Sequence, residues 1–229
     1  MCLKQMKTAF DSEQNTQTHH RLLEAAGEVF AELGYRQATV REICNRAHAN
    51  VAAINYHFHD KQGLYEAVLK YALARVRNNY PTGHEPVTPD NAERELHDMI
   101  AARLHAVFDL GQTAWHSKLM SREMIEPTKA LDALVKEELE PFFQRLQSCI
   151  RAILGSEVSD EQVRRCAFSI SSQWVSYHSN RQVISRLDPA MKFGPEDIGA
   201  LADHIAQFSL AALRGLKRTT DRQQMSPPP

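Results

Sequence analysis

The sequence predicts an all-α protein, and three observations predict this class. Apolar residues recur at the three-to-four-residue spacing of helices along most of the chain. Only 9 Gly and 10 Pro occur among 229 residues, and 3 of those Pro are the last three residues, so helix breakers are few. Capping residues and short turns divide the helical pattern, and no segment shows a convincing strand pattern.

The composition excludes several classes of protein. Hydrophobic residues make up 43% of the chain and charged residues 24%, which is ordinary for a globular protein and not for a collagen-like or disordered one. No apolar run approaches the roughly 18 residues that a membrane span needs. Residues 1–15 lack the apolar core of a secretory signal, so we expect a cytoplasmic protein. The 4 Cys show no CxxC spacing, and we expect neither a disulfide framework nor a metal or cofactor.

The first two predicted helices each have one apolar face. The earlier helix stops at Gly34 and has one apolar face, which consists of Leu22, Ala26, Val29, Phe30 and Leu33. A capping box then opens a short helix, because Thr39 can cap it and Glu42 can reach back from three residues later. The inward face of this short helix consists of Val40, Ile43, Cys44 and Ala47.

A tight turn over residues 47–50 leads to a third helix that ends near His57. Asn50 can cap this helix, and Ile54 and Phe58 lie four residues apart, so they can anchor it to the core. Asp60 caps a longer fourth helix that ends near residue 80. Two short capped helices joined by such a turn are typical of a helix-turn-helix motif, whose second helix enters the major groove of DNA.

The residue types around this motif suit contacts with DNA. Small side chains at Ala52 and Ala53 permit close approach, Val51 can touch a thymine methyl, and Asn55 can pair with a base edge. Tyr56 and His57 can donate to phosphate, and Lys61 lies at the start of the next helix, which favours an anion. The full set of expected DNA contacts is Thr39, Arg41, Asn50, Val51, Ala52, Asn55, Tyr56, His57 and Lys61. The alternatives are packing for Tyr56 and solvation for Arg41.

The stretch AAGEVFAELGYRQATVREICNRAHANVAAINYHFHDKQGLYEAVL, residues 25–69, resembles the TetR family of bacterial transcriptional regulators. The matching positions are Gly34, Tyr35, Thr39, Val40, Glu42, Ile43, Tyr56, His57, Phe58, Lys61 and Leu64. Two positions depart from the family: His48 replaces a usual Gly in the turn, and Asn55 stands where an aromatic is common. His tolerates a left-handed backbone better than most residues.

A break rich in Pro separates this motif from the rest of the chain. We expect a disordered arm, a DNA-binding domain, a linker, a larger helical domain and a disordered tail, over residues 1–17, 18–80, 81–89, 90–218 and 219–229. The larger domain should contain helices near 90–109, 113–125, 128–154, 159–186 and 195–217. Its segment 122–135 resembles a CecR-like subgroup linked to drug and transport regulation.

The family resemblance implies that the larger domain dimerises and binds a small ligand. Apolar stripes on the last two helices suggest a four-helix interface made of Ile170, Trp174, Tyr177, Ile198, Leu201, Ile205, Phe208 and Ala212. A core within one chain is the alternative. Aromatic and Met side chains suggest a pocket for an apolar or aromatic ligand, lined by His105, Phe108, Trp115, Met120, Arg122, Met124, Phe143, Trp174 and His178. Glu123 could also orient such a ligand, and core packing is the alternative for each residue.

These features predict a homodimeric repressor, not an enzyme, that binds a palindromic double-stranded DNA operator and is released by a small-molecule effector. Two other hypotheses stay open. One is an all-helical metal-binding protein or enzyme, which the 11 His favour, although no metal or nucleophile motif occurs. The pairs His57/His59 and Cys44/His48 could bind a metal, but both lie in the DNA-reading motif. The other is a protein-interaction module that has lost DNA binding, which only the departures at His48 and Asn55 favour.

Overall fold

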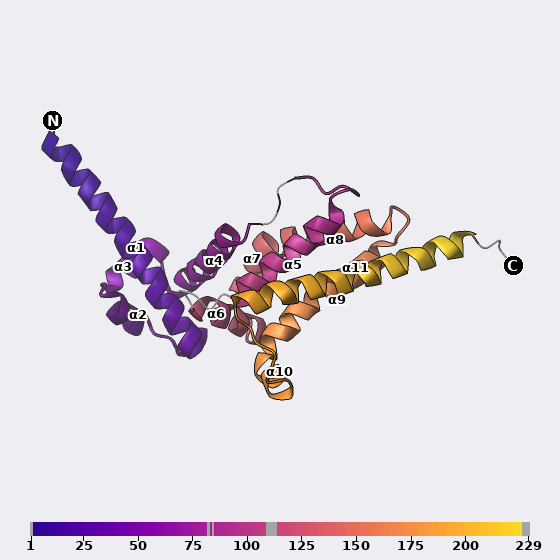
Figure 1. Cartoon of the computed structure of the whole chain (residues 1–229). Helices are drawn as coiled ribbons and strands as arrows, with labels where there is room; N and C mark the ends of the chain where they lie inside the picture. Colours follow the sequence, from indigo (N-terminus) through magenta and orange to yellow (C-terminus); the bar gives the residue numbers. More distant parts are fainter. Residues whose placement is uncertain (1, 82, 84, 109–113, 226–229) are drawn as a thin grey trace. The chain divides into compact units, whose positions relative to one another are not determined.

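A computed structural model describes residues 2–81, 83, 85–108 and 114–225 of the chain (Figure 1). These residues form helices joined by turns and short connections, and no strand occurs among them, so the predicted all-α class is confirmed. The chain divides into two compact units. The first unit consists of Met1–Arg75 and Leu110–Val135, and the second unit consists of Val76–Asp109 and Lys136–Pro229.

The first unit begins with helix α1, Cys2–Gln37. We expected a disordered arm over residues 1–17, but the backbone is helical from Cys2. The helix is interrupted where the sequence predicted, because Gly34 has a φ of 78° and a ψ of 165°. A side chain is strained at such a positive φ, and glycine is not. A Cβ at Gly34 would also meet the guanidinium of Arg122, but that flexible side chain can move, so the backbone conformation is what favours glycine here.

Helices α2 (Val40–Ala47) and α3 (Val51–Phe58) form the expected motif. The Thr39 hydroxyl accepts a hydrogen bond from the backbone N–H of Glu42 at 3.2 Å, and the Asn50 carboxamide accepts one from Ala52 at 3.0 Å. The other half of the expected capping box differs, since the Glu42 carboxylate lies 3.6 Å from the Arg46 guanidinium. The turn between the helices holds His48 at φ 50° and ψ 47°, the left-handed conformation expected for this position.

Helix α4, Lys61–Asn79, follows α3 after a very short connection. The Asp60 carboxylate accepts from the Gly63 N–H at 2.8 Å, as predicted for its cap. The backbone at His59 has a φ of 69° and a ψ of −52°, and the Asp60 N–H donates to the Phe58 carbonyl at 2.9 Å. These dihedrals and this bond define a γ-turn of the rare, strained kind.

Two further helices, α6 (Ala114–Ile125) and α7 (Ala130–Leu134), belong to the first unit. Trp115, Leu119 and Ala130 are buried in the same hydrophobic core as α1 to α4. The expected domain boundary at residues 81–89 is therefore incomplete, because a segment assigned to the larger domain completes the core of the smaller one.

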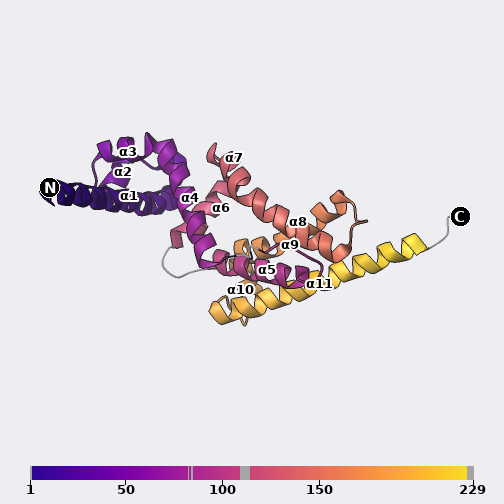
Figure 2. The same cartoon turned by 90° about the horizontal axis from the view of Figure 1, so that it is seen from above.

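The second unit contains α5 (Ala92–Phe108), α8 (Glu140–Leu154), α9 (Asp160–Ser179), α10 (Arg181–Leu187) and α11 (Pro195–Met225). All of these except α10 contribute to one hydrophobic core. Figures 1 and 2 show α5 and α11 side by side, and the Arg214 guanidinium bonds the Glu93 carboxylate between them at 3.0 Å.

Three helix boundaries differ from the predictions. A π-helical turn, Val135–Leu139, divides the helix expected over 128–154. The helix expected over 159–186 stops at Asn180, and α10 follows it. We expected a disordered tail over 219–229, but α11 continues to Met225, and residues 226–229 lie outside the described part of the chain.

None of the helices in the described residues is long and apolar enough to span a membrane. The Cys44, Cys149 and Cys166 side chains are buried and reduced, as expected of small apolar residues on helices. Burial raises the pKa of the Cys149 thiol to about 11.

Candidate nucleic-acid interface

Helix α3 has one buried and one exposed face. Ile54 is fully buried and Phe58 nearly so, which anchors the helix as its sequence predicted. Asn50, Ala52 and Asn55 are exposed on the helix, and Val51 and Tyr56 expose 46% and 73% of their surface. Val51 and Tyr56 are therefore accessible to a partner on this face. The Asn55 amide on this face suits a base edge in a major groove, whereas the Asn50 amide oxygen is used in capping the helix.

The rings beside this face support one another. The His57 ring contacts Tyr56 edge-on at 4.9 Å and His19 of α1 at 5.4 Å between centroids. His19 in turn stacks on Phe58 at 4.8 Å. Burial, together with the neighbouring His57 and His20, lowers the pKa of His19. His57 is thus held in a fixed position at the edge of α3, and the sequence patterns did not predict the part of His19.

Lys61 is less free than its sequence position predicted. Its ammonium lies 4.7 Å from the centroid of the Tyr35 ring and donates to the Arg36 carbonyl at 3.4 Å. Burial lowers the pKa of Lys61. An ammonium has three donors, so Lys61 can still meet a phosphate at the start of α4. Thr39 and Arg41, at the start of α2, are both exposed.

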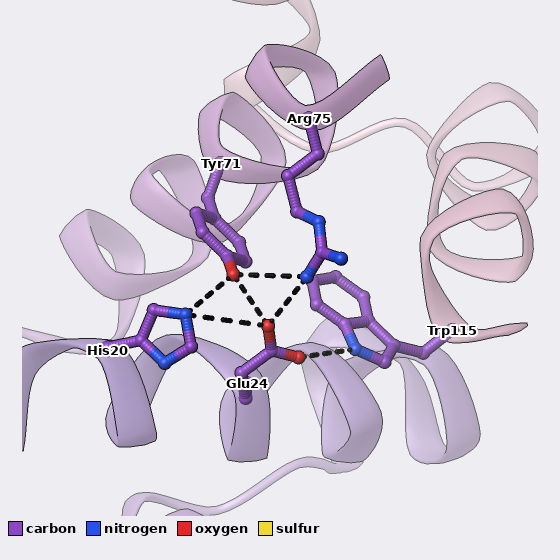
Figure 3. Close-up of polar contacts among 5 residues, drawn as sticks. All are labelled: His20, Glu24, Tyr71, Arg75 and Trp115. Atoms are coloured by element: carbon purple, nitrogen blue, oxygen red, sulfur yellow. Dashed lines mark hydrogen bonds and ion pairs between the residues drawn. The ribbon is translucent and has the colours of Figure 1, made fainter. Parts of the chain in front are cut away.

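A cluster of polar side chains holds α1, α4 and α6 together (Figure 3). The Glu24 carboxylate accepts from the Tyr71 hydroxyl at 2.6 Å, the Arg75 guanidinium at 3.0 Å and the Trp115 indole at 3.1 Å. The His20 ring meets the Tyr71 hydroxyl at 2.9 Å. Burial raises the pKa of Glu24, but the hydrogen bonds from Tyr71 and Trp115 and the charge of Arg75 outweigh it and hold the pKa below its usual value.

A second carboxylate in the first unit is entirely buried. Glu123 accepts from the Tyr65 hydroxyl at 2.6 Å and from the backbone N–H and hydroxyl of Thr128 at 2.9 and 3.0 Å. We expected that Glu123 could orient a ligand, but these three donors already satisfy it within the unit. Burial, followed by the bond to Glu123, raises the pKa of Tyr65.

The expected ligand residues do not all lie in one unit. The first unit contains four of them, Trp115, Met120, Arg122 and Met124. Trp115 is buried against Gly27, where an added Cβ would overlap its ring. Met124 is 49% exposed. The other five belong to the second unit and are His105, Phe108, Phe143, Trp174 and His178.

Within the second unit, two aromatic groups contain Phe108, His178 and Trp174, and Phe143 lies beside the second group, 6.4 Å from Phe142. His105 is in neither group and stacks on Tyr80 at 5.8 Å. Phe108 stacks on Phe193 at 5.1 Å and meets His178 edge-on at 5.7 Å. Trp174 meets Phe142 at 6.1 Å, and the Arg103 guanidinium lies 4.1 Å from the centroid of the same Phe142 ring. Burial lowers the pKa of Arg103 to about 10. Sequence patterns missed Arg103, because nothing in the spacing along α5 shows that it meets a ring on α8.

Most of the expected dimer residues face the core of their own chain. Ile170, Trp174, Ile198, Leu201 and Ile205 are buried in the core of the second unit, and Tyr177 packs against it. Phe208 and Ala212 are exposed, as expected. The predicted apolar stripes therefore lie mainly on the inner face of each helix. The exposed apolar residues on the same two helices are Phe168, Val175, Phe208 and Leu216.

A capped bracing helix, a tight turn and a short exposed second helix define a helix-turn-helix protein of the DNA-binding class. Comparison with known proteins agrees. The family model for bacterial regulatory proteins of the tetR family matches residues 22–68. The model for the C-terminal domain of the HTH-type transcriptional dual regulator CecR matches residues 92–213. The chain belongs to the TetR family of transcriptional regulators and has a CecR-type C-terminal domain.

Individual relatives and solved structures share little sequence identity with this chain. The HTH-type transcriptional dual regulator CecR of Shigella flexneri is 26% identical over 176 residues, which cover 73% of this chain and 78% of that protein. The regulator PfmR of Thermus thermophilus has a similar structure, with a TM-score of 0.60, 16% identity and coverage of 83% and 94%. A TetR-like regulator from a Rhodococcus species has a TM-score of 0.61, 14% identity and coverage of 85% and 96%. These two likenesses concern the fold alone.

Proposed function

We propose that the protein is a dimeric repressor that binds a near-palindromic operator through α3 and releases it when a small apolar or aromatic effector binds. The observation that carries the DNA part is the exposed face of α3, where Val51, Asn55 and Tyr56 lie above the buried Ile54 and Phe58. Two copies of this helix in a dimer would meet half-sites about one helical turn, ~34 Å, apart.

In this proposal Asn55 and Val51 contact bases and determine the DNA sequence that is bound. The DNA phosphate backbone is contacted by Tyr56, His57, Lys61, Thr39 and Arg41. An Asn side chain can pair bidentately with adenine, and a Val can contact a thymine methyl. Selection of bound sequences from a random library tests this. Asn55→Ala should relax the preference at one position of each half-site, and Lys61→Ala should weaken binding to all sequences alike. An unchanged selection profile for Asn55→Ala would contradict the assignment.

The exposed apolar residues of α9 and α11 support a homodimer. Phe168 and Val175 on α9 expose 62% and 55% of their surface, and Phe208 on α11 exposes 61%. Gln173 of α9 donates to the Ser209 hydroxyl of α11 at 3.1 Å, which joins the two helices beside these residues. A second copy presenting the same two helices would cover this surface in a four-helix arrangement.

The aromatic groups around Phe108 and Trp174 support an effector site in the second unit. Their flat rings suit an apolar or aromatic ligand, and His178, which meets Phe108, can orient it. An effector can release DNA only through a difference in affinity between two states of the protein. A thermal-shift screen of aromatic compounds, followed by operator binding with the hits, tests both steps. Compounds that stabilise the protein without weakening operator binding would contradict regulation by that site.

The sign of regulation is the second part of the proposal. One relative is named a dual regulator, and AcnR of Corynebacterium diphtheriae, which is 32% identical over 121 residues, is named a repressor. A reporter fused to the chain's own upstream DNA, measured in cells with and without the protein, tests repression directly. Higher reporter activity with the protein present would show activation at that site.

A further inference from the structure

A cavity of about 930 Å³ lies wholly within the first unit. The end of α1, the start of α4 and the segment from α6 to α7 line it, so it joins parts of the chain that are far apart in sequence. Its volume is within the range of pockets that bind small molecules, roughly 300–1,000 Å³. Its lining is mostly polar, in contrast to the aromatic groups of the second unit.

Three cationic side chains line the cavity: Arg36, Arg122 and Lys129. Arg122 makes one hydrogen bond, from its guanidinium to the Glu32 carbonyl at 3.3 Å, and this leaves most of its donors unused. Across the described residues, neither the Arg36 guanidinium nor the Lys129 ammonium has an acidic partner within ion-pair distance. Cations that converge on one cavity and have few bonded acidic partners favour an anionic ligand.

The acidic groups nearby are already engaged or lie at the surface. Glu32 lines the cavity, but its carboxylate is bonded by both terminal nitrogens of Arg46 at 3.1 Å. Glu123, behind Tyr65, is fully buried and has its three donors within the unit. Glu126 also lines the cavity and is exposed. A ligand would therefore meet more free positive than free negative charge.

We propose that this cavity binds a small organic polyanion with two or more carboxylate or phosphate groups. Arg36 and Arg122 can each hold one anionic group through paired N–H donors, and Lys129 can contact either group as a point charge. The site is separate from the aromatic effector site proposed above and takes a ligand of different chemistry. Since Arg36 precedes α2 and the other two cations belong to α6 and the connection to α7, the ligand ties these segments together.

Titration calorimetry of the full chain, without DNA and at constant ionic strength, tests the proposal with citrate and with pyrophosphate as probes. We expect saturable binding of at least one probe with a Kd of about 1 mM or tighter. Tighter binding of citrate would indicate a carboxylate ligand, and tighter binding of pyrophosphate would indicate a phosphate ligand. Arg122→Gln and Lys129→Gln should each weaken binding about tenfold. Arg94→Gln in the second unit removes the same charge from an exposed site and should change nothing.

A variant that fills the cavity without changing its charge tests whether the anion binds there. Gln62 lines the cavity at the start of α4 and is exposed, so Gln62→Phe should fill part of the space and weaken binding. The exposed Lys129 has no bonded partner to lose, so Lys129→Gln should fold normally, which circular dichroism checks.

Four results would overturn the proposal. The first is that neither probe binds, and the second is that Arg94→Gln weakens binding as much as Arg122→Gln does. The third is that Gln62→Phe binds like the unaltered chain, which would put the anion elsewhere. The fourth is that Arg122→Gln and Lys129→Gln lower DNA affinity at every sequence while probe binding is unchanged, because these cations would then be DNA contacts.

Discussion

Backbone strain at single residues is concentrated in the connection between α3 and α4. His59 adopts the left-handed side of backbone space within its γ-turn, at φ 69°. Four residues later a Cβ at Gly63 would overlap the Phe58 carbonyl, so only glycine fits there. The connection has to be this tight because Asp60 must cap α4 immediately after Phe58 is buried.

At position 59, glycine should therefore stabilise the protein more than alanine does, which is the reverse of their order in a helix. His59→Gly relieves the strain and His59→Ala keeps it, so the glycine variant should be more stable by about 1 kcal/mol. Gly63→Ala should lower stability instead, because the backbone of α3 would have to move. Urea unfolding of the three variants measures this, and an alanine variant as stable as the glycine variant at residue 59 would refute the strain.

At the scale of helices, the Glu24 cluster decides how α6 joins the first unit. Glu24→Gln keeps the shape but loses the charge that Tyr71, Arg75 and Trp115 share, and it should cost about 1–2 kcal/mol of unfolding free energy. Glu28→Gln on the same helix is a matched control, because the Glu28 carboxylate is half-exposed and its ion pair with Arg46, at 3.5 Å, is a surface contact. Its effect should stay within about 0.5 kcal/mol.

The same cluster predicts a dependence on pH. Because the folded pKa of Glu24 lies below its usual 4.5, its stabilisation is complete above that value and is lost as the pH falls. The stability difference between the unaltered chain and Glu24→Gln should shrink below pH 4.5. A difference that stays constant down to the acid transition would contradict the ion pair with Arg75.

The stability contributed by an ion pair between α5 and α11 should depend on pH in the opposite direction. The His97 ring meets the Asp203 carboxylate at 2.7 Å, and this bond raises the pKa of His97 above its usual 6.5. Its stabilisation is present below pH 6.5 and is lost as the pH rises through the raised value. Both side chains are more than a third exposed, so Asp203→Asn should cost only a few tenths of a kcal/mol at acidic pH. An equal cost in alkaline solution would refute it.

Helices whose signals are local were predictable, and those that depend on distant contacts were not. Thr39, Asn50 and Asp60 cap the helices that follow them through bonds two or three residues away, so α2, α3 and α4 have the bounds that the sequence predicts. No local pattern shows that Trp115 meets Glu24, 91 residues earlier. The unit that contains α6 therefore differs from the prediction. The break at Asn180 likewise has no strong breaker in the sequence. The π-helical turn does have a local signal, because Pro141 lies two residues after it and has no N–H to donate to Glu137.

The candidate sites show the same limit at the scale of the whole molecule. The exposed residues of α3 were predictable, because Ile54 and Phe58 identify its inner face. The expected dimer residues stay a prediction, because an apolar stripe does not show whether its partner is the same chain or another. Ile205, for example, belongs to the stripe and is fully buried within its own chain.

Charges placed on the exposed apolar face should separate the proposed dimer. Phe208→Glu and Val175→Glu should each shift the protein toward monomers in sedimentation experiments, because a charge would be buried without a partner. Leu187→Glu on α10, at a side chain that is 80% exposed, is the matched control and should leave the mass unchanged. Monomers formed by the control alone would move the interface to α10.

The most direct test of the account is the affinity of the chain for its own upstream DNA, measured by fluorescence anisotropy over a salt series beside a scrambled duplex of equal length. The account predicts preference for the natural sequence, and an affinity that falls linearly with the logarithm of salt concentration because phosphate contacts release counterions. Binding that is absent at low salt, or equal for both duplexes, would contradict the claim that the exposed face of α3 reads DNA.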